Sequence, residues 1–177
     1  NCLAPVAKVL HEGLVIRYGL INTIHAYTSS QNLLDGPHKD LRRARSAAEN
    51  LIPTSTGAAR AIGLIMPELE GKLDGLAIRA PVVCGSILDL TCMVEEETSA
   101  DSVNDLLRGQ AEGPMKGILA VEDAPVVSSD IIGSTYSSIV SPSDTYVAGG
   151  HLVKVLSWYD NEWGFSNRCV DMMSRMV

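Results

Sequence analysis

The chain has 177 residues, of which 46% are hydrophobic and 20% charged, and its formal net charge is −7. This composition is that of a globular protein with one domain, and no apolar run approaches the roughly 20 residues that span a bilayer. A net acidic chain also argues against a nucleic-acid partner, because neutralising phosphates needs a basic surface. The four cysteines lack the short paired spacing of a zinc site, so we expect a cytoplasmic protein with free thiols and no metal.

The first predicted element is a helix whose apolar stripe consists of Leu3, Val6, Ala7 and Leu10. Pro5 is tolerated only in a first turn, so we expect this helix to start at or just before Asn1. Cys2 then lies at a helix N-terminus, which stabilises a thiolate, and His25 could act as its base. The alternative is that Cys2 is an ordinary buried residue in a sequence cut from a longer protein.

Residues 20–27 are rich in β-branched and aromatic side chains and predict a strand, with His25 near its end. Residues 29–39 have little periodicity and predict a long loop, which in a compact domain is often functional. A short helix is expected over residues 41–50. The hydroxyl-rich segment 53–57 should then lead, as a loop, into a helix over residues 58–65.

The rest of the chain predicts strands over residues 76–80, 86–95, 118–121, 126–131, 137–140 and 151–159, and helices over 99–113 and 162–177. The last helix carries an apolar stripe made of Phe165, Cys169, Met172, Met173 and Met176, which needs a surface to pack on. The strands cluster with short connections, so we expect an α+β fold with a mostly antiparallel sheet and helices on one face. The glycine fingerprint of a Rossmann domain is absent from this sequence.

Two features together suggest a phosphorylated ligand. Residues 39–45 contain four of the fourteen basic residues, and arginine suits phosphate because its planar fork binds two oxygens at once. Ser55, Thr56 and Gly57 precede a helix, where hydroxyls and free N–H groups can hold an oxyanion. Each feature also has a structural explanation, as a solvated helix face and as a helix cap. Arg79 lies in a predicted strand and needs an anion, either an internal carboxylate or a ligand.

Four motifs occur in the same order in phosphorylating glyceraldehyde-3-phosphate dehydrogenases: residues 1–5 (NCLAP), 24–28 (IHAYT), 53–59 (PTSTGAA) and 157–162 (SWYDNE). The chain resembles the catalytic half of that family from end to end. In the family pattern Ser-Cys-Thr-Thr-Asn-Cys the first cysteine is the nucleophile, and Cys2 matches the second. The resemblance therefore implies a fragment that starts just after the catalytic cysteine, three positions before Asn1, and that lacks the cofactor domain.

The resemblance also implies a role for each matching residue. His25 matches the base that activates the cysteine and takes a proton when hydride leaves, which suits an imidazole that titrates near neutral pH. Three residues match the substrate phosphate site, and two more match the loop that receives inorganic phosphate. The first set is Thr28, Arg43 and Arg79, and the second is Thr56 and Gly57. Asn161 matches the asparagine that binds the nicotinamide carboxamide.

By this resemblance, residues 1–160 form a catalytic and substrate-binding domain, and residues 161–177 form a helix that packs on the missing cofactor domain. Pro37 favours NAD over NADP, and the loop around it implies a homotetramer when the protein is complete. The expected reaction is the NAD-dependent oxidation and phosphorylation of glyceraldehyde 3-phosphate to 1,3-bisphosphoglycerate in glycolysis or gluconeogenesis. The fragment should be inactive alone.

Two rivals remain at this point. Erythrose-4-phosphate dehydrogenases resemble Trp163-Gly164-Phe165, but they lack the Thr-Gly loop that receives inorganic phosphate, so Thr56 and Gly57 favour the triose enzyme. The second rival is a non-catalytic relative that binds phosphorylated ligands or partner subunits.

Overall fold

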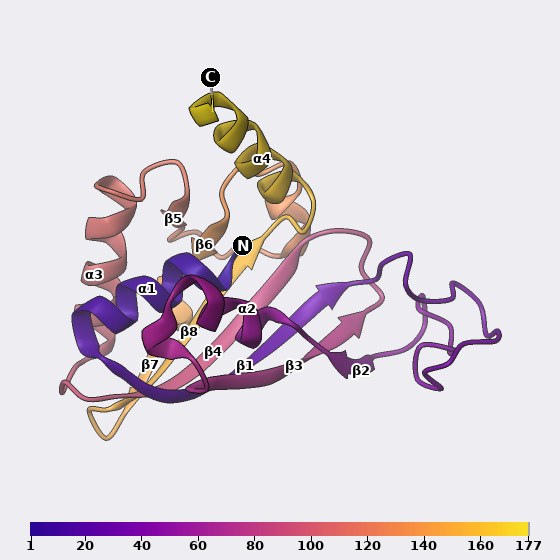
Figure 1. The fold of residues 1–177 in the computed structure, drawn as a ribbon, viewed down its shortest axis with the longest axis horizontal. Helices are drawn as coiled ribbons and strands as arrows, with labels where there is room; N and C mark the ends of the chain where they lie inside the picture. Colours follow the sequence, from indigo (N-terminus) through magenta and orange to yellow (C-terminus); the bar gives the residue numbers. More distant parts are fainter. Residues whose placement is uncertain (177) are drawn as a thin grey trace.

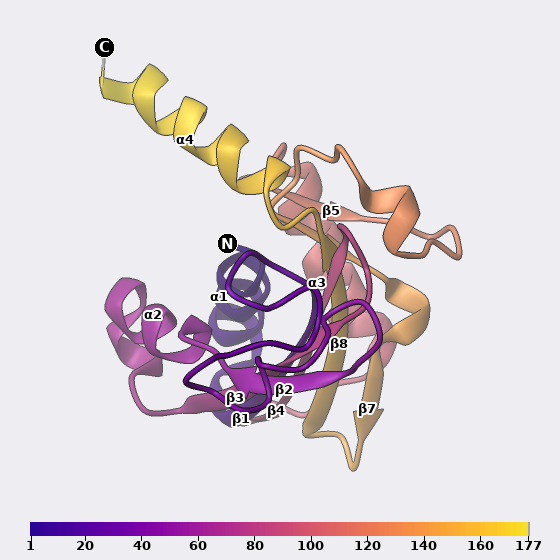
Figure 2. The same ribbon diagram turned by 90° about the vertical axis from the view of Figure 1, so that its right-hand side faces the viewer.

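The computed structural model describes residues 1–176, which form one mixed β-sheet with helices packed against one of its faces (Figures 1 and 2). Its strands lie in the order β2-β3-β1-β4-β8-β6-β5, and β7 pairs with β8. The strands are β1 (Ile16–Ala26), β2 (Ile52–Ser55), β3 (Leu73–Ala80), β4 (Ser86–Val94), β5 (Leu119–Val121), β6 (Ser138–Val140), β7 (Tyr146–Ala148) and β8 (Leu152–Tyr159). The helices are α1 (Leu3–Leu14), α2 (Ala58–Ile65), α3 (Ala100–Glu112) and α4 (Trp163–Met176).

The predicted α+β class with a mostly antiparallel sheet is confirmed, although two strand pairs are parallel. β1 runs parallel to β3, and β5 runs parallel to β6. Parallel neighbours need a long crossover connection, and α2 lies within the one that joins β1 to β3. No helix within residues 1–176 is long and apolar enough to cross a membrane.

The core lies between α1 and the inner face of the sheet. α1 buries Leu3, Val6 and Leu10 as its spacing predicts, but its first helical residue is Leu3, with Cys2 as the N-cap, and not a residue at or before Asn1 as expected. Along β4 the buried residues alternate with partly exposed ones, which places Leu88 and Leu90 on the same inner face. Among residues 1–176, no helix covers the opposite face of β1 and β3, where Leu20 and Leu76 are exposed (Figure 2).

Three predictions of local structure are wrong. Residues 41–50 form turns instead of a helix, because backbone and side-chain bonds to the preceding loop, such as Gly36 N–H to Ala44 O, take the place of helical bonds. Residues 126–131 form a 3₁₀ turn over Ser128–Ile131 instead of a strand, since the Asp130 carboxylate accepts the Val127 N–H. Residues 53–55, expected as part of a loop over 53–57, belong to β2 (Ile52–Ser55), and β7 was also missed.

The predicted final helix is present as α4, and Val177 lies outside the described residues. α4 projects away from the rest of the molecule (Figures 1 and 2), and so does the long segment between β1 and β2 (Figure 1). The stripe on α4 is exposed along Phe165, Met172, Met173 and Met176. The expected packing surface for this stripe is not formed by the described residues.

Candidate functional site

One edge of the sheet brings together most of the residues that the sequence singled out. β1 and β3 end at this edge, β4 begins there, and β8 ends there because it runs antiparallel to β4. His25 pairs directly with Arg79, and Ser86 pairs with Tyr159. Asn161 follows β8 by two residues, so the candidate base and the candidate cofactor ligand lie at the same end of the sheet, on β1 and just after β8, with β4 between them.

His25 is partly buried, and its surroundings disfavour the protonated ring. Its Nδ1 lies 2.7 Å from the carbonyl oxygen of Ala26, and its ring meets the Tyr159 ring edge-on at 5.9 Å between centroids. Burial lowers the pKa of His25, the bond to Ala26 opposes that shift, and the positive charge of Arg79 adds to it. When Nδ1–H donates to the carbonyl, Nε2 keeps its lone pair and can accept a proton.

Arg79 lies against His25 without an ion-pair partner. Its Nη1 is 2.5 Å from His25 Nδ1 and donates to the Ala26 carbonyl oxygen at 3.1 Å. Among residues 1–176 no carboxylate lies within ion-pair distance of this guanidinium. Burial lowers the pKa of Arg79; Tyr159 opposes this shift, and the nearby charge of Arg43 adds to it. The internal-carboxylate interpretation is therefore wrong, and a bound anion would relieve both effects.

The basic segment divides between this edge and the surface. Arg43 donates through Nε to the hydroxyl of Thr54 in β2 at 2.9 Å and lies 3.5 Å from Asp40. Arg45 instead forms an exposed ion pair with Asp35 at 3.2 Å. The structure thus brings Arg43 near Arg79, whereas Arg45 is neutralised elsewhere.

Thr28, Thr56 and Gly57 are held by local contacts. The Thr28 hydroxyl bonds to that of Ser30 at 2.9 Å, and the Thr56 hydroxyl accepts the Ala58 N–H at 3.2 Å at the start of α2. Gly57 is exposed at the cap position of that helix. Ile52 of β2 pairs with Arg79, and Ser55 lies three positions farther along the same strand, which is about 10 Å away. Within residues 1–176 no side-chain hydrogen bond joins these residues to His25 or Arg79.

Asn161 is fixed by its side-chain oxygen. Oδ1 accepts the Gly85 N–H at 3.2 Å and the Ser86 hydroxyl at 3.4 Å. The turn before α4 is held by Asp160, whose carboxylate accepts backbone N–H groups of Gly133, Glu162 and Trp163 at 2.7–2.9 Å. Burial alone would raise the pKa of Asp160, but these backbone bonds outweigh it and the pKa is lowered.

Ser86, Tyr159 and Asp160 were missed at the sequence level. Ser86 and Tyr159 follow the same alternation as the apolar residues of β4 and β8, so a polar group on a buried face was the available signal. For Asp160 the available signal was its position just before a predicted helix. It lies two residues before Glu162 and three before Trp163, whose N–H groups have no partner within the helix.

Cys2 is an ordinary buried thiol. Its Sγ lies 3.4 Å from the Ser138 hydroxyl and donates to the Ser157 carbonyl at 3.8 Å. Burial raises the pKa of Cys2, and its hydrogen bonds to the two serines only partly offset this. The reactive-thiol interpretation of Cys2 is wrong, because burial outweighs the field of the helix N-terminus.

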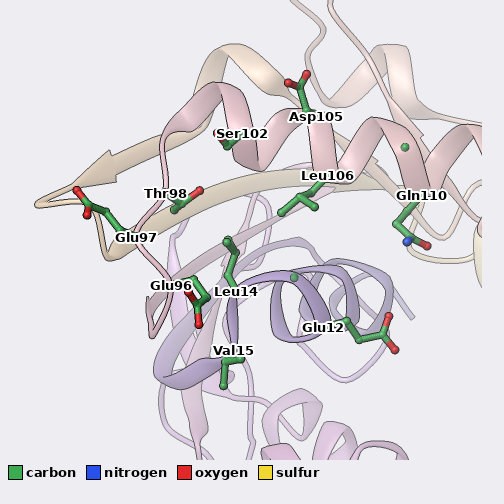
Figure 3. Close-up of a pocket in the computed structure, with 12 residues that line it drawn as sticks. Glu12, Leu14, Val15, Glu96, Glu97, Thr98, Ser102, Asp105, Leu106 and Gln110 are labelled. Atoms are coloured by element: carbon green, nitrogen blue, oxygen red, sulfur yellow. The ribbon is translucent and has the colours of Figure 1, made fainter.

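A hollow of about 910 Å³ lies away from this edge, between α1 and α3 (Figure 3). Four carboxylates, those of Glu12, Glu96, Glu97 and Asp105, line it. Like charges disfavour a phosphorylated ligand there. The cationic sheet edge is thus the better candidate for an anion.

Comparison with known proteins agrees with this geometry. A family model described as "Glyceraldehyde 3-phosphate dehydrogenase, C-terminal domain" matches residues 1–161. Relatives named glyceraldehyde-3-phosphate dehydrogenase come from Mycolicibacterium smegmatis (56% identity), Mycobacterium bovis (58%) and Borreliella burgdorferi (53%). The matches cover 98%, 98% and 100% of this chain but 51%, 51% and 53% of those proteins, so the chain spans about half their length. The chain belongs to the glyceraldehyde-3-phosphate dehydrogenase family and comprises its C-terminal domain.

Proposed function

We propose that this chain is the catalytic half of an NAD-dependent, phosphorylating glyceraldehyde-3-phosphate dehydrogenase. The observation that carries the proposal is the pairing of an imidazole whose pKa is lowered with a guanidinium that has no carboxylate partner among residues 1–176, at the end of the sheet where the Asn161 carboxamide is also fixed. A base, an anion site and a carboxamide partner are the three groups that oxidation of a phosphorylated aldehyde needs. The comparisons support the reaction through the names of the relatives.

In the proposed reaction, a thiolate from the missing half adds to the aldehyde carbon and gives a hemithioacetal. His25 Nε2 takes the hydroxyl proton as hydride leaves the same carbon, which produces a thioester. Inorganic phosphate then attacks the thioester carbonyl, the acyl phosphate forms, and the thiolate is released. NAD⁺, when bound, supplies the hydride acceptor.

The remaining roles follow from charge and donor geometry. Arg79 and Arg43 bind the phosphate of the aldehyde, together with the hydroxyl of Thr28. Thr56 and Gly57, at the N-terminal end of α2, bind the attacking phosphate. Asn161 fits a nicotinamide carboxamide because its oxygen is already occupied by two donors, which leaves its NH₂ group to donate. NAD is the proposed cofactor in preference to NADP.

Exposed apolar surface supports two contacts in the complete protein. The outer face of the sheet leaves Leu20 67% and Leu76 44% exposed, and we assign this face to a second copy in a homotetramer. The stripe on α4, with Phe165 and Met172 each 59% exposed, is assigned to the cofactor domain. By light scattering, the 177-residue chain alone should associate, and a monodisperse monomer would contradict both assignments.

The function is tested with the protein expressed from its complete reading frame. NADH should form from glyceraldehyde 3-phosphate only when inorganic phosphate is present, and faster than from erythrose 4-phosphate. Preference for the tetrose would support the erythrose-4-phosphate enzyme instead. A reading frame that begins at Asn1 without an upstream cysteine, together with no NAD reduction, would support a non-catalytic binding module.

A further inference from the structure

The side-chain amide of Asn161 has a defined orientation. Its oxygen accepts two hydrogen bonds, from the Gly85 N–H at 3.2 Å and from the Ser86 hydroxyl at 3.4 Å. Rotating the amide by half a turn would set its NH₂ group against the Gly85 N–H, which can only donate, and would lose that bond. The Gly85 N–H therefore decides which end of the amide faces outward, and the Ser86 hydroxyl adds a second bond that holds the amide in this orientation.

The direction of the Ser86 bond is also defined. Ser86 is only 1% exposed, and its oxygen accepts the Ala26 N–H at 3.1 Å. A hydroxyl carries a single proton, and with the Ala26 bond using its oxygen as acceptor, that proton is available to Asn161. Ser86 thus donates to the carboxamide and accepts from the peptide that follows the candidate base.

The backbone leaves this arrangement little freedom. Gly85 has φ +84°, and a Cβ at this position would lie 2.2 Å from the Ser128 carbonyl oxygen. Only glycine fits there, so the turn that aims the Gly85 N–H at Asn161 is fixed. Ala26 in turn accepts at its carbonyl the bonds from His25 and Arg79. One buried hydroxyl therefore links the candidate cofactor residue to the candidate base.

We propose that Ser86 is a positioning residue that locks the amide of Asn161 with its NH₂ group toward the nicotinamide carboxamide. This inference rests on the proposed function, in which Asn161 contacts the nicotinamide. The locked amide donates to the carboxamide oxygen and so favours one rotational position of the ring. Without the hydroxyl, the amide keeps only its bond to the Gly85 N–H, so it turns more freely and holds its NH₂ group less firmly toward the carboxamide oxygen.

The test compares NAD⁺ with ADP-ribose, which lacks the nicotinamide, by calorimetry on the complete protein. Ser86→Ala should weaken NAD⁺ binding about three- to tenfold, the effect of one hydrogen bond, and leave ADP-ribose binding unchanged. Ser86→Thr, which keeps a hydroxyl, should restore most of the loss. Ser157→Ala removes an equally buried hydroxyl, bonded to Ser138, from the same face of the sheet and should not change the NAD⁺ to ADP-ribose ratio.

A double-mutant cycle separates this inference from the proposed function. Asn161→Ala should weaken NAD⁺ binding, and adding Ser86→Ala to it should then cost nothing further. An additive loss, or equal losses for both ligands, would overturn the positioning role. If Asn161→Ala itself leaves NAD⁺ binding unchanged, the proposed function of Asn161 fails instead. If Ser86→Ala folds poorly, Ser86→Thr becomes the deciding variant. The double variant Ser86→Thr/Asn161→Ala should bind NAD⁺ as tightly as Asn161→Ala alone, and weaker binding by the double variant would refute the inference.

Discussion

The variant Arg79→Ala tests whether Arg79 binds the substrate phosphate or stabilises the fold. The guanidinium is partly buried, lies against His25, donates to the Ala26 carbonyl oxygen, and has no carboxylate within ion-pair distance among residues 1–176. Removing it should therefore leave the free energy of unfolding within about 0.5 kcal/mol of the parent's, or raise it.

The loss should appear in substrate binding instead. A hydrogen bond to a charged group contributes roughly 1.5–3 kcal/mol, and about 1.4 kcal/mol corresponds to a factor of ten. Arg79→Ala should thus raise KM for glyceraldehyde 3-phosphate about ten- to a hundredfold. Steady-state NADH formation measures this, with unphosphorylated glyceraldehyde as the second substrate, for which KM should hardly change.

Arg45→Ala is the matched control, because its guanidinium pairs with Asp35 at the surface. It should leave KM for both aldehydes unchanged. The reasoning about Arg79 would be refuted by equal effects on the two aldehydes, or by a large loss of stability, since either result would make Arg79 a structural residue.

Three further predictions concern folding and thiol chemistry. Gly75→Ala should lower stability by about 1–3 kcal/mol or more in denaturant unfolding, because its Cβ would lie 2.0 Å from a β1 carbonyl oxygen, whereas Gly57→Ala enters open space and should be neutral. Asp160→Ala should lower the free energy of unfolding by about 0.5–2 kcal/mol at neutral pH. Because the folded-state pKa of Asp160 is lowered, the difference in stability between the variant and its parent should vanish as the pH falls through that pKa. Burial raises the pKa of Cys2, and that of Cys92 to about 12, so mass spectrometry should find both thiols alkylated only after unfolding; labelling of the folded protein would contradict this.

Periodicity predicted the elements that pack on the core. α2 begins and ends as expected, and β4 and β8 differ from expectation by only a residue or so, because alternating or helical burial determines them. The segment from 41 to 50 failed for the opposite reason. Its structure depends on contacts with the neighbouring loop, such as the bond from Ser46 N–H to the Asp35 carboxylate, which no local pattern reports.

The candidate site was predicted in part. His25 and Asn161 were found by motif, and the structure adds the register that puts Arg79 beside His25. That register is a long-range property of two parallel strands, so the sequence left the partner of Arg79 open between a carboxylate and a ligand. Ser86 was not found because a single serine in an apolar alternation carries little signal until its partners are known.

The central claim is that His25 is the base for hydride transfer at this edge, and single-turnover kinetics of the complete protein test it most directly. With saturating NAD⁺ and glyceraldehyde 3-phosphate, His25→Asn should slow NADH formation about a hundred- to ten-thousandfold while leaving NAD⁺ affinity unchanged. A single-turnover rate equal to that of the parent would contradict the account.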